Sequence, residues 1–135
     1  MYLLDTNVVS EIRKTRPHGG VLAWMASAPD RGLYLSSVTF GEIQVGIENA
    51  RRSDPAKAIE LEAWADELMS TAQILSPDAP IFRIWAKLMQ GRPRDWYEDA
   101  LIAATAIRHD LIVVTRNMRD FRHFDVQLLN PFTSK

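Results

Sequence analysis

Short apolar runs alternate with longer stretches of helical character along the chain. The run Leu111–Thr115 consists almost entirely of branched apolar residues, which is typical of a strand buried on both faces of a sheet. Three other runs are bounded by polar or turn residues and indicate further strands. The predicted strands are Tyr2–Leu4, Leu33–Ser36, Leu111–Thr115 and Val126–Leu129.

The stretches between these runs carry helix start and stop signals. Ser53 or Asp54 followed by Pro55 provides a cap and a first-turn proline, so a long helix is expected from Pro55 to about Gln73. A helix is expected from Val8 onward, and the stretch Arg16–Gly20 breaks it. Three other predicted helices are Val21–Ala28, Thr39–Arg52 and Tyr97–His109, and Pro29 and Asp30 end the first of them. A further helix is expected to begin at Pro77 and Pro80 and to end near Gly91.

The order of these elements predicts the fold class. Strands separated by helical stretches imply right-handed crossovers and a parallel sheet covered on both faces. We therefore expect a three-layer α/β/α domain with a central, mainly parallel sheet. The length of 135 residues fits a single domain, residues 1–135. Ligands of such folds gather beyond the carboxyl ends of the strands.

The composition is that of a globular protein, with 47% apolar and 24% charged residues. The net charge of -1 gives no overall attraction to nucleic acid or to an anionic membrane. The absence of cysteine excludes disulfides, thiolate chemistry and cysteine zinc sites, and it suits a reducing cytoplasm. We expect no secretory leader and no membrane span, because no run approaches about 18 apolar residues.

Acidic residues stand where predicted strands end or helices begin. Asp5 directly follows the first strand, where a buried carboxylate is costly unless it caps a helix or forms part of a charged site. Asp99 lies at the start of an otherwise apolar helix, which suits a charged site. The alternative interpretation is that Asp99 or Glu98 only interacts favourably with the positive N-terminal end of that helix. Glu42 lies in the first turn of the helix after the second strand, where Thr39 and Glu42 fit a capping box. On this segment alone, a capping role is the preferred interpretation of Glu42.

Asp5, Glu42 and Asp99 should nevertheless converge on one edge of one sheet. Two unit charges about 4 Å apart repel by about 4 kcal/mol at an effective dielectric near 20, so three carboxylates need compensation there. A hard divalent cation removes the repulsion. Oxygen ligands without cysteine or paired histidines suit Mg²⁺ or Mn²⁺ and argue against zinc. The histidines occur singly in polar stretches and are left out of the site.

The stretch VVTRNMRDF follows the buried strand and adds polar groups to this edge. Thr115, Arg116, Asn117 and Asp120 arrive there together, although Asn and Asp also suit a plain turn. A metal held by carboxylates lowers the pKa of a bound water and neutralises charge on a phosphoryl oxygen. An arginine can hold the neighbouring phosphate with two hydrogen bonds.

Four stretches in order, LLDTNVVSE, SSVTFGEIQVGI, EDALIAATA and VVTRNMRDF, together with the closing LLNPF, carry a family resemblance. The sequence resembles the PIN-domain ribonucleases, and most closely the VapC-type toxins of bacterial toxin–antitoxin pairs. The resemblance spans essentially the whole chain. It implies a metal-dependent endoribonuclease, a hydrolase that uses Mg²⁺ or Mn²⁺ and cuts RNA phosphodiester bonds with activated water.

Carried over by position, the resemblance implies that Asp5, Glu42 and Asp99 hold the metal. The family's fourth polar position, often aspartate, falls on Asn117 in this chain. A neutral amide oxygen lowers the charge of the site, which puts a second tightly bound metal in question. Asp120 would then supply the missing carboxylate, directly or through water. These five residues are the candidate catalytic residues.

The resemblance also implies supporting residues and partners. Thr6 and Thr115 look like hydrogen-bond donors behind the acids, and Arg116 is a candidate for contact with a phosphate or a partner. Such toxins are cytoplasmic and are held silent by a cognate antitoxin, commonly a small DNA-binding protein, so a homodimer or a toxin–antitoxin hetero-oligomer is expected. Trp24 and Trp64 offer apolar interface area, although core packing is the simpler use of a single tryptophan.

Two other functions stay open. A phosphatase of the haloacid dehalogenase type also places an aspartate after its first strand, but it needs a second acid two residues later, where this chain has Asn7. A catalytically inactive PIN module acting as a binding or regulatory scaffold is supported by Asn117. The three acids Asp5, Glu42 and Asp99 speak against it.

Overall fold

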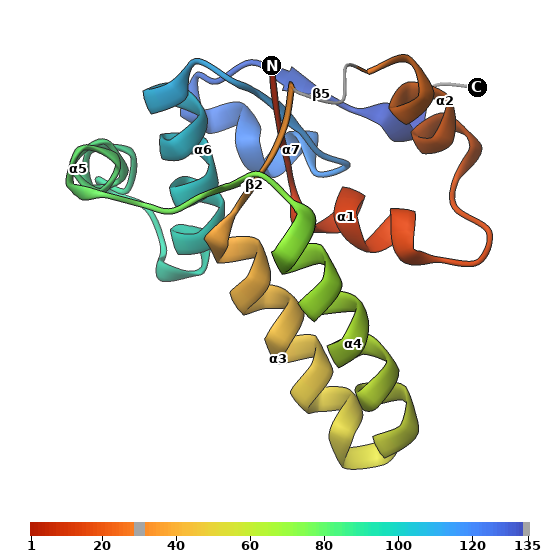
Figure 1. Ribbon diagram of the computed structural model, residues 1–135. Helices are drawn as coiled ribbons and strands as arrows, with labels where there is room; N and C mark the ends of the chain where they lie inside the picture. The colour runs from red at the N-terminus through yellow and green to blue at the C-terminus, as the bar shows by residue number, and fades with distance from the viewer. Residues whose placement is uncertain (29–31, 134–135) are drawn as a thin grey trace.

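The computed structural model describes residues 1–28 and 32–133, and within this part of the chain five strands form one sheet. The strands follow the order β3-β2-β1-β4-β5, so β1 lies in the middle. In Figure 1 the red strand that leads from the N-terminus into the first helix is β1. All neighbouring pairs are parallel, which confirms the predicted class of sheet. The strands are β1 (Tyr2–Leu4), β2 (Leu33–Ser36), β3 (Ile74–Leu75), β4 (Ile112–Val114) and β5 (Leu128–Leu129).

The central strands send alternate side chains to opposite faces of the sheet. Leu4 lies beside Leu35 and Val114, and these three side chains belong to one buried apolar cluster. Leu3 lies beside Val113 in a second cluster on the other face. Because side chains of a strand alternate with a period of two, strands of only three or four residues supply both cores.

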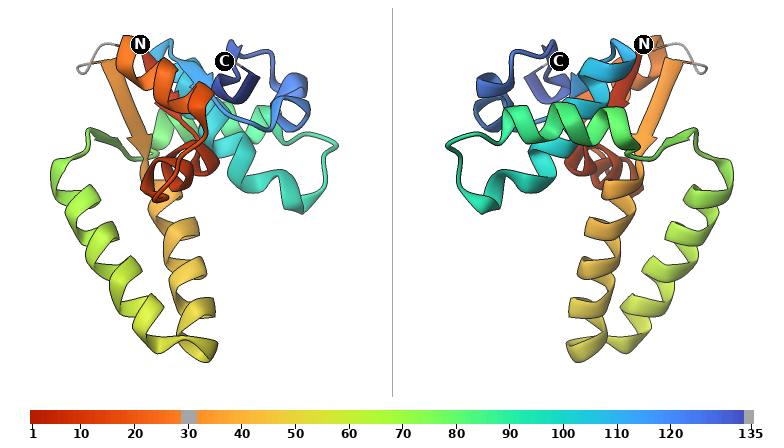
Figure 2. Two further views of the ribbon diagram at one scale, coloured as in Figure 1. Left: turned by 90° about the vertical axis from the view of Figure 1, so that its right-hand side faces the viewer. Right: turned by 90° about the vertical axis from the view of Figure 1, so that its left-hand side faces the viewer.

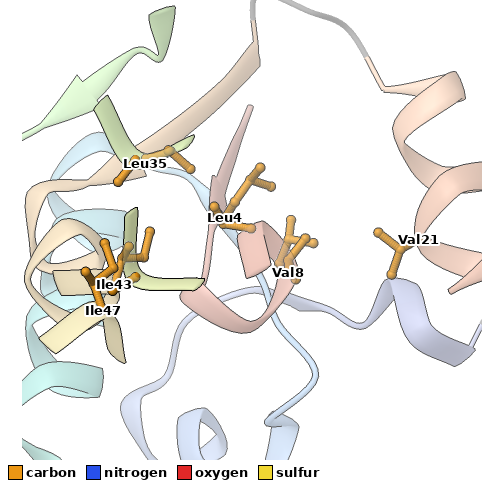
Figure 3. Packing of buried hydrophobic residues seen from close by; sticks show 10 residues of the cluster. Leu4, Val8, Val21, Leu35, Ile43 and Ile47 are labelled. Carbon is orange, nitrogen blue, oxygen red and sulfur yellow. The ribbon is translucent and has the colours of Figure 1, made fainter. Parts of the chain in front are cut away.

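Helices α1, α2, α3 and α4 cover the face of Leu4. Figure 3 shows side chains from β1, β2, α1, α2 and α3 on this face. The packing explains why both predicted interface tryptophans are partly buried: Trp24 and Trp64 pack against this cluster. Beyond the sheet, α3 and α4 run side by side as a helical hairpin that projects from the body (Figure 2). The bounds are α1 (Thr6–Arg13), α2 (Gly19–Ser27), α3 (Ser37–Ser53) and α4 (Pro55–Thr71).

Helices α5, α6 and α7 cover the opposite face, which completes the predicted three layers. Alanines and Ile102 on one side of α6 are fully buried against Leu3 and Val113. Phe121 and Phe124 close this core from the segment after β4. The bounds are α5 (Ala79–Leu88), α6 (Tyr97–His109) and α7 (Met118–Phe121), with short 3-10 helices η2 (Arg94–Trp96), η3 (Arg122–Phe124) and η4 (Pro131–Thr133).

Several predicted ends of helices and strands agree with the structure, whereas other ends depend on contacts that the sequence does not reveal. Strands β1 and β2 and helix α6 have the predicted ends, and Asp54 caps α4 as expected. Helix α1 begins at Thr6 rather than at Val8, because Asp5 caps it. The remaining predicted helices and strands are present with ends that differ by one to three residues, a shift common at element ends.

The predicted start of the helix after β2 was wrong. Helix α3 begins at Ser37, and the hydroxyl of Ser36 accepts a hydrogen bond from the backbone N–H of Val38 at 3.1 Å. Thr39 is therefore the third helical residue, and Glu42 lies in the second turn. The Thr39–Glu42 capping box is ruled out, which frees Glu42 for another role.

Helix α2 also begins earlier than predicted. Its cap is His18, whose Nδ1 accepts a hydrogen bond from the backbone N–H of Gly20 at 2.9 Å, so the two glycines expected in the break are helical. The predicted stop at Pro29 and Asp30 lies outside the described residues. Strand β3 and helix α7 were not predicted. Both are too short to produce a periodic pattern.

No helix in the described part of the chain is long and apolar enough to cross a lipid bilayer. The assignment of residues 1–135 to one domain stays a prediction, and it implies a single cooperative unfolding transition.

Helix α6 provides a matched test of the second core. Ile102 is fully buried and Ile107 is 39% exposed on the same helix. We expect Ile102→Ala to lower the free energy of unfolding by about 2–5 kcal/mol through lost burial and a residual cavity. Ile107→Ala should change it by about 0.5 kcal/mol or less. Urea denaturation measures both, and equal losses would contradict the described packing of α6.

Candidate active site

Asp5 directly follows the central strand β1 and caps helix α1 with its side chain. The backbone N–H of Thr6 donates to Asp5 Oδ1 at 2.8 Å, and the Thr115 hydroxyl donates to Asp5 Oδ2 at 2.8 Å. Asn7 Nδ2 donates to the same Oδ2 at 3.1 Å. Asp5 is only 4% exposed, so these donors compensate a buried carboxylate. Its side chain is therefore both a helix cap and a buried acid at the strand-exit edge.

The Thr115 hydroxyl connects the end of β4 to α1 and α7. Besides donating to Asp5, it accepts a hydrogen bond from the backbone N–H of Asn117 at 2.9 Å and lies 3.3 Å from Asn7 Nδ2. A hydroxyl offers one donor and two acceptor sites, so its capacity is fully used. This arrangement brings the backbone of Asn117 close to Asp5 and suits the predicted supporting role of Thr115.

Glu42 reaches the same edge from α3. The Thr6 hydroxyl donates to Glu42 Oε1 and also lies 3.1 Å from the hydroxyl of Thr39, which is fully buried. Thr6 thus binds two acids at once, Asp5 through its backbone N–H and Glu42 through its hydroxyl. Two predicted metal ligands are held together by a residue predicted to support them.

Asp99 and Asp120 line a small polar cavity of about 120 Å³ together with Asp95 and Trp96. Asp99 lies in the first turn of α6, and Asp120 lies in α7. The Asn117 side chain makes no capping hydrogen bond to α7, and the residue is exposed. Of the two candidates for the fourth acidic position, Asp120 is therefore the one whose side chain shares a cavity with Asp99.

The pKa shifts of the acids show that their charges interact. Burial is the main cause that raises the pKa of Asp5, against its hydrogen bonds, and the charge of Asp120 adds to the rise. Burial, followed by the charges of Asp5, Asp120 and Glu98, raises the pKa of Asp99 to about 7. Burial also raises the pKa of Glu42 to about 7, against the Thr6 hydrogen bond, with contributions from Glu98 and Asp5. The acids therefore form one electrostatic group.

Glu98 belongs to this group, although the sequence suggested only that it favours a helix end. Its position next to Asp99 in the first turn of α6 was the sequence signal that could have identified Glu98 as a member of the group. No lysine or arginine among the described residues forms an ion pair with Asp5, Glu42, Glu98, Asp99 or Asp120. The negative charge of the edge is thus not cancelled by basic side chains.

The donor set suits a hard divalent cation, because it contains carboxylate, amide and hydroxyl oxygens without sulfur or imidazole. Within the described ranges, no three histidine, aspartate or glutamate side chains are already gathered closely enough to hold one ion. A shared ion between Asp5, Glu42 and Asp99 therefore requires a rotamer change or a bridging water.

A larger cavity of about 290 Å³ lies on the α1 and α4 side of the sheet. Its lining is mainly apolar and includes Leu4, Val9, Met25, Trp64 and Leu68. None of the residues around it is acidic or basic, so it offers neither metal ligands nor a general acid or base. The acidic edge is the better candidate for chemistry.

Comparison of the sequence with known proteins gives consistent matches. The PIN domain family model matches residues 2–127. Toxin FitB of Neisseria gonorrhoeae is 32% identical, over 98% of this chain and 99% of its own length. VapC ribonuclease Y4jK of Sinorhizobium fredii is 31% identical, over 98% of each chain.

Solved structures give the same result. The crystal structure of FitAcB from Neisseria gonorrhoeae has a TM-score of 0.81 at 33% identity and covers 98% of this chain and 99% of that chain. A structure of FitAB bound to an IR36 DNA fragment has a TM-score of 0.73 at 30% identity, covering 100% and 98%. VapBC-1 from nontypeable Haemophilus influenzae has a TM-score of 0.71 at 26% identity, covering 96% and 97%.

The raised pKa values predict an unusual dependence of stability on pH. Glu42 and Asp99 have ordinary values of 4.5 and 3.8, and both are raised to about 7 in the folded protein. Between these limits the folded state binds more protons than the unfolded state, so the free energy of unfolding should fall as pH rises from about 4 to about 7. Urea denaturation in EDTA across this range measures the fall.

Asp99→Asn should reduce this fall and leave the metal-free protein at least as stable at pH 7.5, because repulsion is relieved. The matched control is Asp66→Asn, an exposed acid of α4, which should keep the original pH profile. An unchanged profile in Asp99→Asn would show that this carboxylate does not share its charge with the others.

Proposed function

This chain belongs to the PIN-domain family, as its motifs predicted, and we propose that it is an endoribonuclease that hydrolyses RNA phosphodiester bonds as the toxin of a toxin–antitoxin pair. The observation that carries the proposal is the group of acids from β1, α3, α6 and α7, whose charges interact without a basic partner among the described residues. Relatives named as ribonucleases support the reaction class.

The proposed cofactor is Mg²⁺ or Mn²⁺. Asp5, Glu42 and Asp99 would hold the ion, and Asp120 would add a carboxylate that the neutral Asn117 lacks. Such an ion lowers the pKa of a bound water and neutralises charge that develops on a phosphoryl oxygen. The raised pKa values of Asp5, Glu42 and Asp99 support this proposal, because a nearby dication would favour their charged forms.

The neutral residues behind the acids would orient them. Thr115 and Asn7 fix both the rotamer and the position of Asp5, and Thr6 couples Asp5 to Glu42. Hydrogen bonds of this kind hold ligands in place before the ion and the substrate arrive, which reduces reorganisation in the transition state. Thr6 and Thr115 would therefore act through the carboxylates rather than on the RNA.

We infer that the chain has a protein partner. Both FitAB and VapBC-1 are two-component complexes in the solved structures, and the FitAB structure contains DNA. By analogy, a cognate antitoxin with DNA-binding capacity would hold this chain inactive in a hetero-oligomer, and a homodimer is the alternative assembly. A cytoplasmic location follows from that role.

The competing proposal is a catalytically inactive PIN module that serves as a scaffold. Asn117 in place of an acid favours it. The hydrogen bonds that hold Asp5 and Glu42 weigh against it, because a scaffold has no need of acids from separate elements held together without a basic partner among the described residues.

RNA cleavage by the purified chain should require Mg²⁺ or Mn²⁺ and be lost in Asp5→Asn. Thr115→Val should lower cleavage by about 10–100-fold, as is typical when a hydrogen-bond partner of a metal ligand is removed. The Asp66→Asn variant should cleave normally. Gel assays with labelled RNA at fixed metal concentration measure all four proteins.

The melting temperature provides a readout that does not depend on cleavage. A ligand at about 100 times its Kd stabilises the folded state by about 2.7 kcal/mol, so millimolar Mg²⁺ or Mn²⁺ should raise the melting temperature of the original chain but not of Asp5→Asn. Metal binding without cleavage would favour the scaffold. No metal-induced shift together with no cleavage would refute the nuclease proposal.

A further inference from the structure

Arg116 occupies a defined position beside the acids. It follows Thr115, and its backbone N–H donates to Asn7 Oδ1 at 3.1 Å. The other end of the same amide, Asn7 Nδ2, donates to Asp5 Oδ2 at 3.1 Å. A single side chain therefore links the backbone of Arg116 to the buried carboxylate, and the position of Arg116 is fixed relative to Asp5.

The guanidinium of Arg116 stacks on an aromatic ring from the end of the chain. Its central carbon lies 3.9 Å from the ring centroid of Phe132 in η4. That ring is itself held, because the backbone N–H of Phe132 donates to Asn130 Oδ1 at 2.9 Å and the His18 ring lies 5.3 Å away. Cation–π stacking covers a face of the guanidinium and leaves its edge N–H groups free.

Glu11 lies behind this pair as a buried carboxylate of α1, 6% exposed. It accepts a hydrogen bond from the backbone N–H of His18 at 2.8 Å and forms an ion pair with Lys14 at 2.9 Å. Arg116 Nη2 is 3.8 Å from Glu11 Oε1, which is beyond hydrogen-bond distance. Lys14 is the closer partner of Glu11, so Arg116 forms only a long ion pair with this carboxylate and keeps its N–H donors unused by it.

The guanidinium of Arg116 is thus oriented but not saturated. Its side chain is 54% exposed, and within the described part of the chain its guanidinium makes no hydrogen bond. Arginine has five N–H donors in a planar fork that matches two phosphate oxygens. An exposed fork that is stacked on Phe132 and whose backbone is held by Asn7 suits a phosphate group of a bound polyanion.

We propose that Arg116 binds a backbone phosphate of the RNA that flanks the cleaved bond, and that Phe132 and Glu11 are positioning residues that hold its guanidinium. The proposal rests on the ribonuclease function proposed above. The acids alone repel a polyanion, whereas the exposed cation of Arg116, whose backbone is held by Asn7, would attract one of its phosphates. Phosphate rather than base contact means that the effect does not depend on RNA sequence.

RNA binding without cleavage tests the proposal directly. The Kd of a fluorescently labelled, mixed-sequence single-stranded RNA is measured in EDTA over a series of salt concentrations. Arg116→Gln should weaken binding about tenfold at low salt, and the slope of log affinity against log salt should fall by about 0.7, the value for one phosphate contact on a single strand. Arg108→Gln, the same change at an exposed position in the last turn of α6, should alter neither quantity.

The positioning role has its own readout. Phe132→Leu keeps an apolar side chain but removes the stacking, and it should weaken RNA binding about threefold through the freed guanidinium. In the Arg116→Gln background, Phe132→Leu should add nothing, since the two residues act as one unit. A purely structural role would lower the melting temperature and leave the salt slope unchanged.

Cleavage of the same RNA with Mn²⁺ separates this proposal from the function on which it rests. Arg116→Gln should raise KM with little change in kcat, because a flanking phosphate is bound equally before and in the transition state. If the original chain cleaves RNA but Arg116→Gln alters neither affinity, salt slope nor KM, the phosphate role is wrong and the nuclease function stands. Loss of antitoxin binding alone in Arg116→Gln would also overturn it. Weakened RNA binding by Arg116→Gln in a chain that never cleaves would uphold the contact and reject the nuclease.

Discussion

The structure depends on keeping one carboxylate satisfied inside the protein without neutralising it. Asp5 directly follows the central strand, and its oxygens accept hydrogen bonds from Thr6, Asn7 and Thr115. These donors come from α1 and from the end of β4, so the start of the first helix and the exit of the neighbouring strand are fixed by the same side chain. Each donor is neutral. Three donors occupy three of the about four lone-pair sites of Asp5, while its negative charge remains available to a ligand.

This choice of donors has consequences for the rest of the edge. A lysine or arginine paired with Asp5 would have stabilised the fold, yet it would also have occupied the place of a cation. Burial, and after it the charges of neighbouring acids, instead raise the pKa values of Glu42 and Asp99, and the apolar cores on both faces of the sheet must outweigh that repulsion. Local destabilisation of this kind is expected at functional sites, where rules that favour stability are broken in favour of chemistry.

The sequence predicted those elements whose signals are local. The apolar helix Tyr97–His109 and the strand Leu33–Ser36 have strong patterns, and the structure has both with the predicted ends. The role of Glu42 was harder to predict, because both Ser36 and Thr39 are residue types that cap helices, and the sequence pattern favoured the wrong one. The contributions of Glu98 and Asp120 depend on the spatial approach of α3, α6 and α7, which spacing along the chain does not encode. The contact between Arg116 and Phe132 joins two segments with no shared local pattern.

The segment after β4 shows how two neighbouring residues at a bend can serve two purposes. Thr115 directs its hydroxyl into the protein toward Asp5, while the next residue, Arg116, sends its guanidinium onto Phe132. The chain bends at Arg116, and these two neighbours in sequence reach different partners. The backbone of Arg116 is bound by Asn7, which also binds Asp5, and the two sides are therefore mechanically connected. A displacement of Phe132 would first move the guanidinium of Arg116, which is stacked on it. It would reach Asp5 only through Asn7, which binds both the backbone of Arg116 and the carboxylate of Asp5. Arg116 is therefore more sensitive than Asp5 to a movement of this segment.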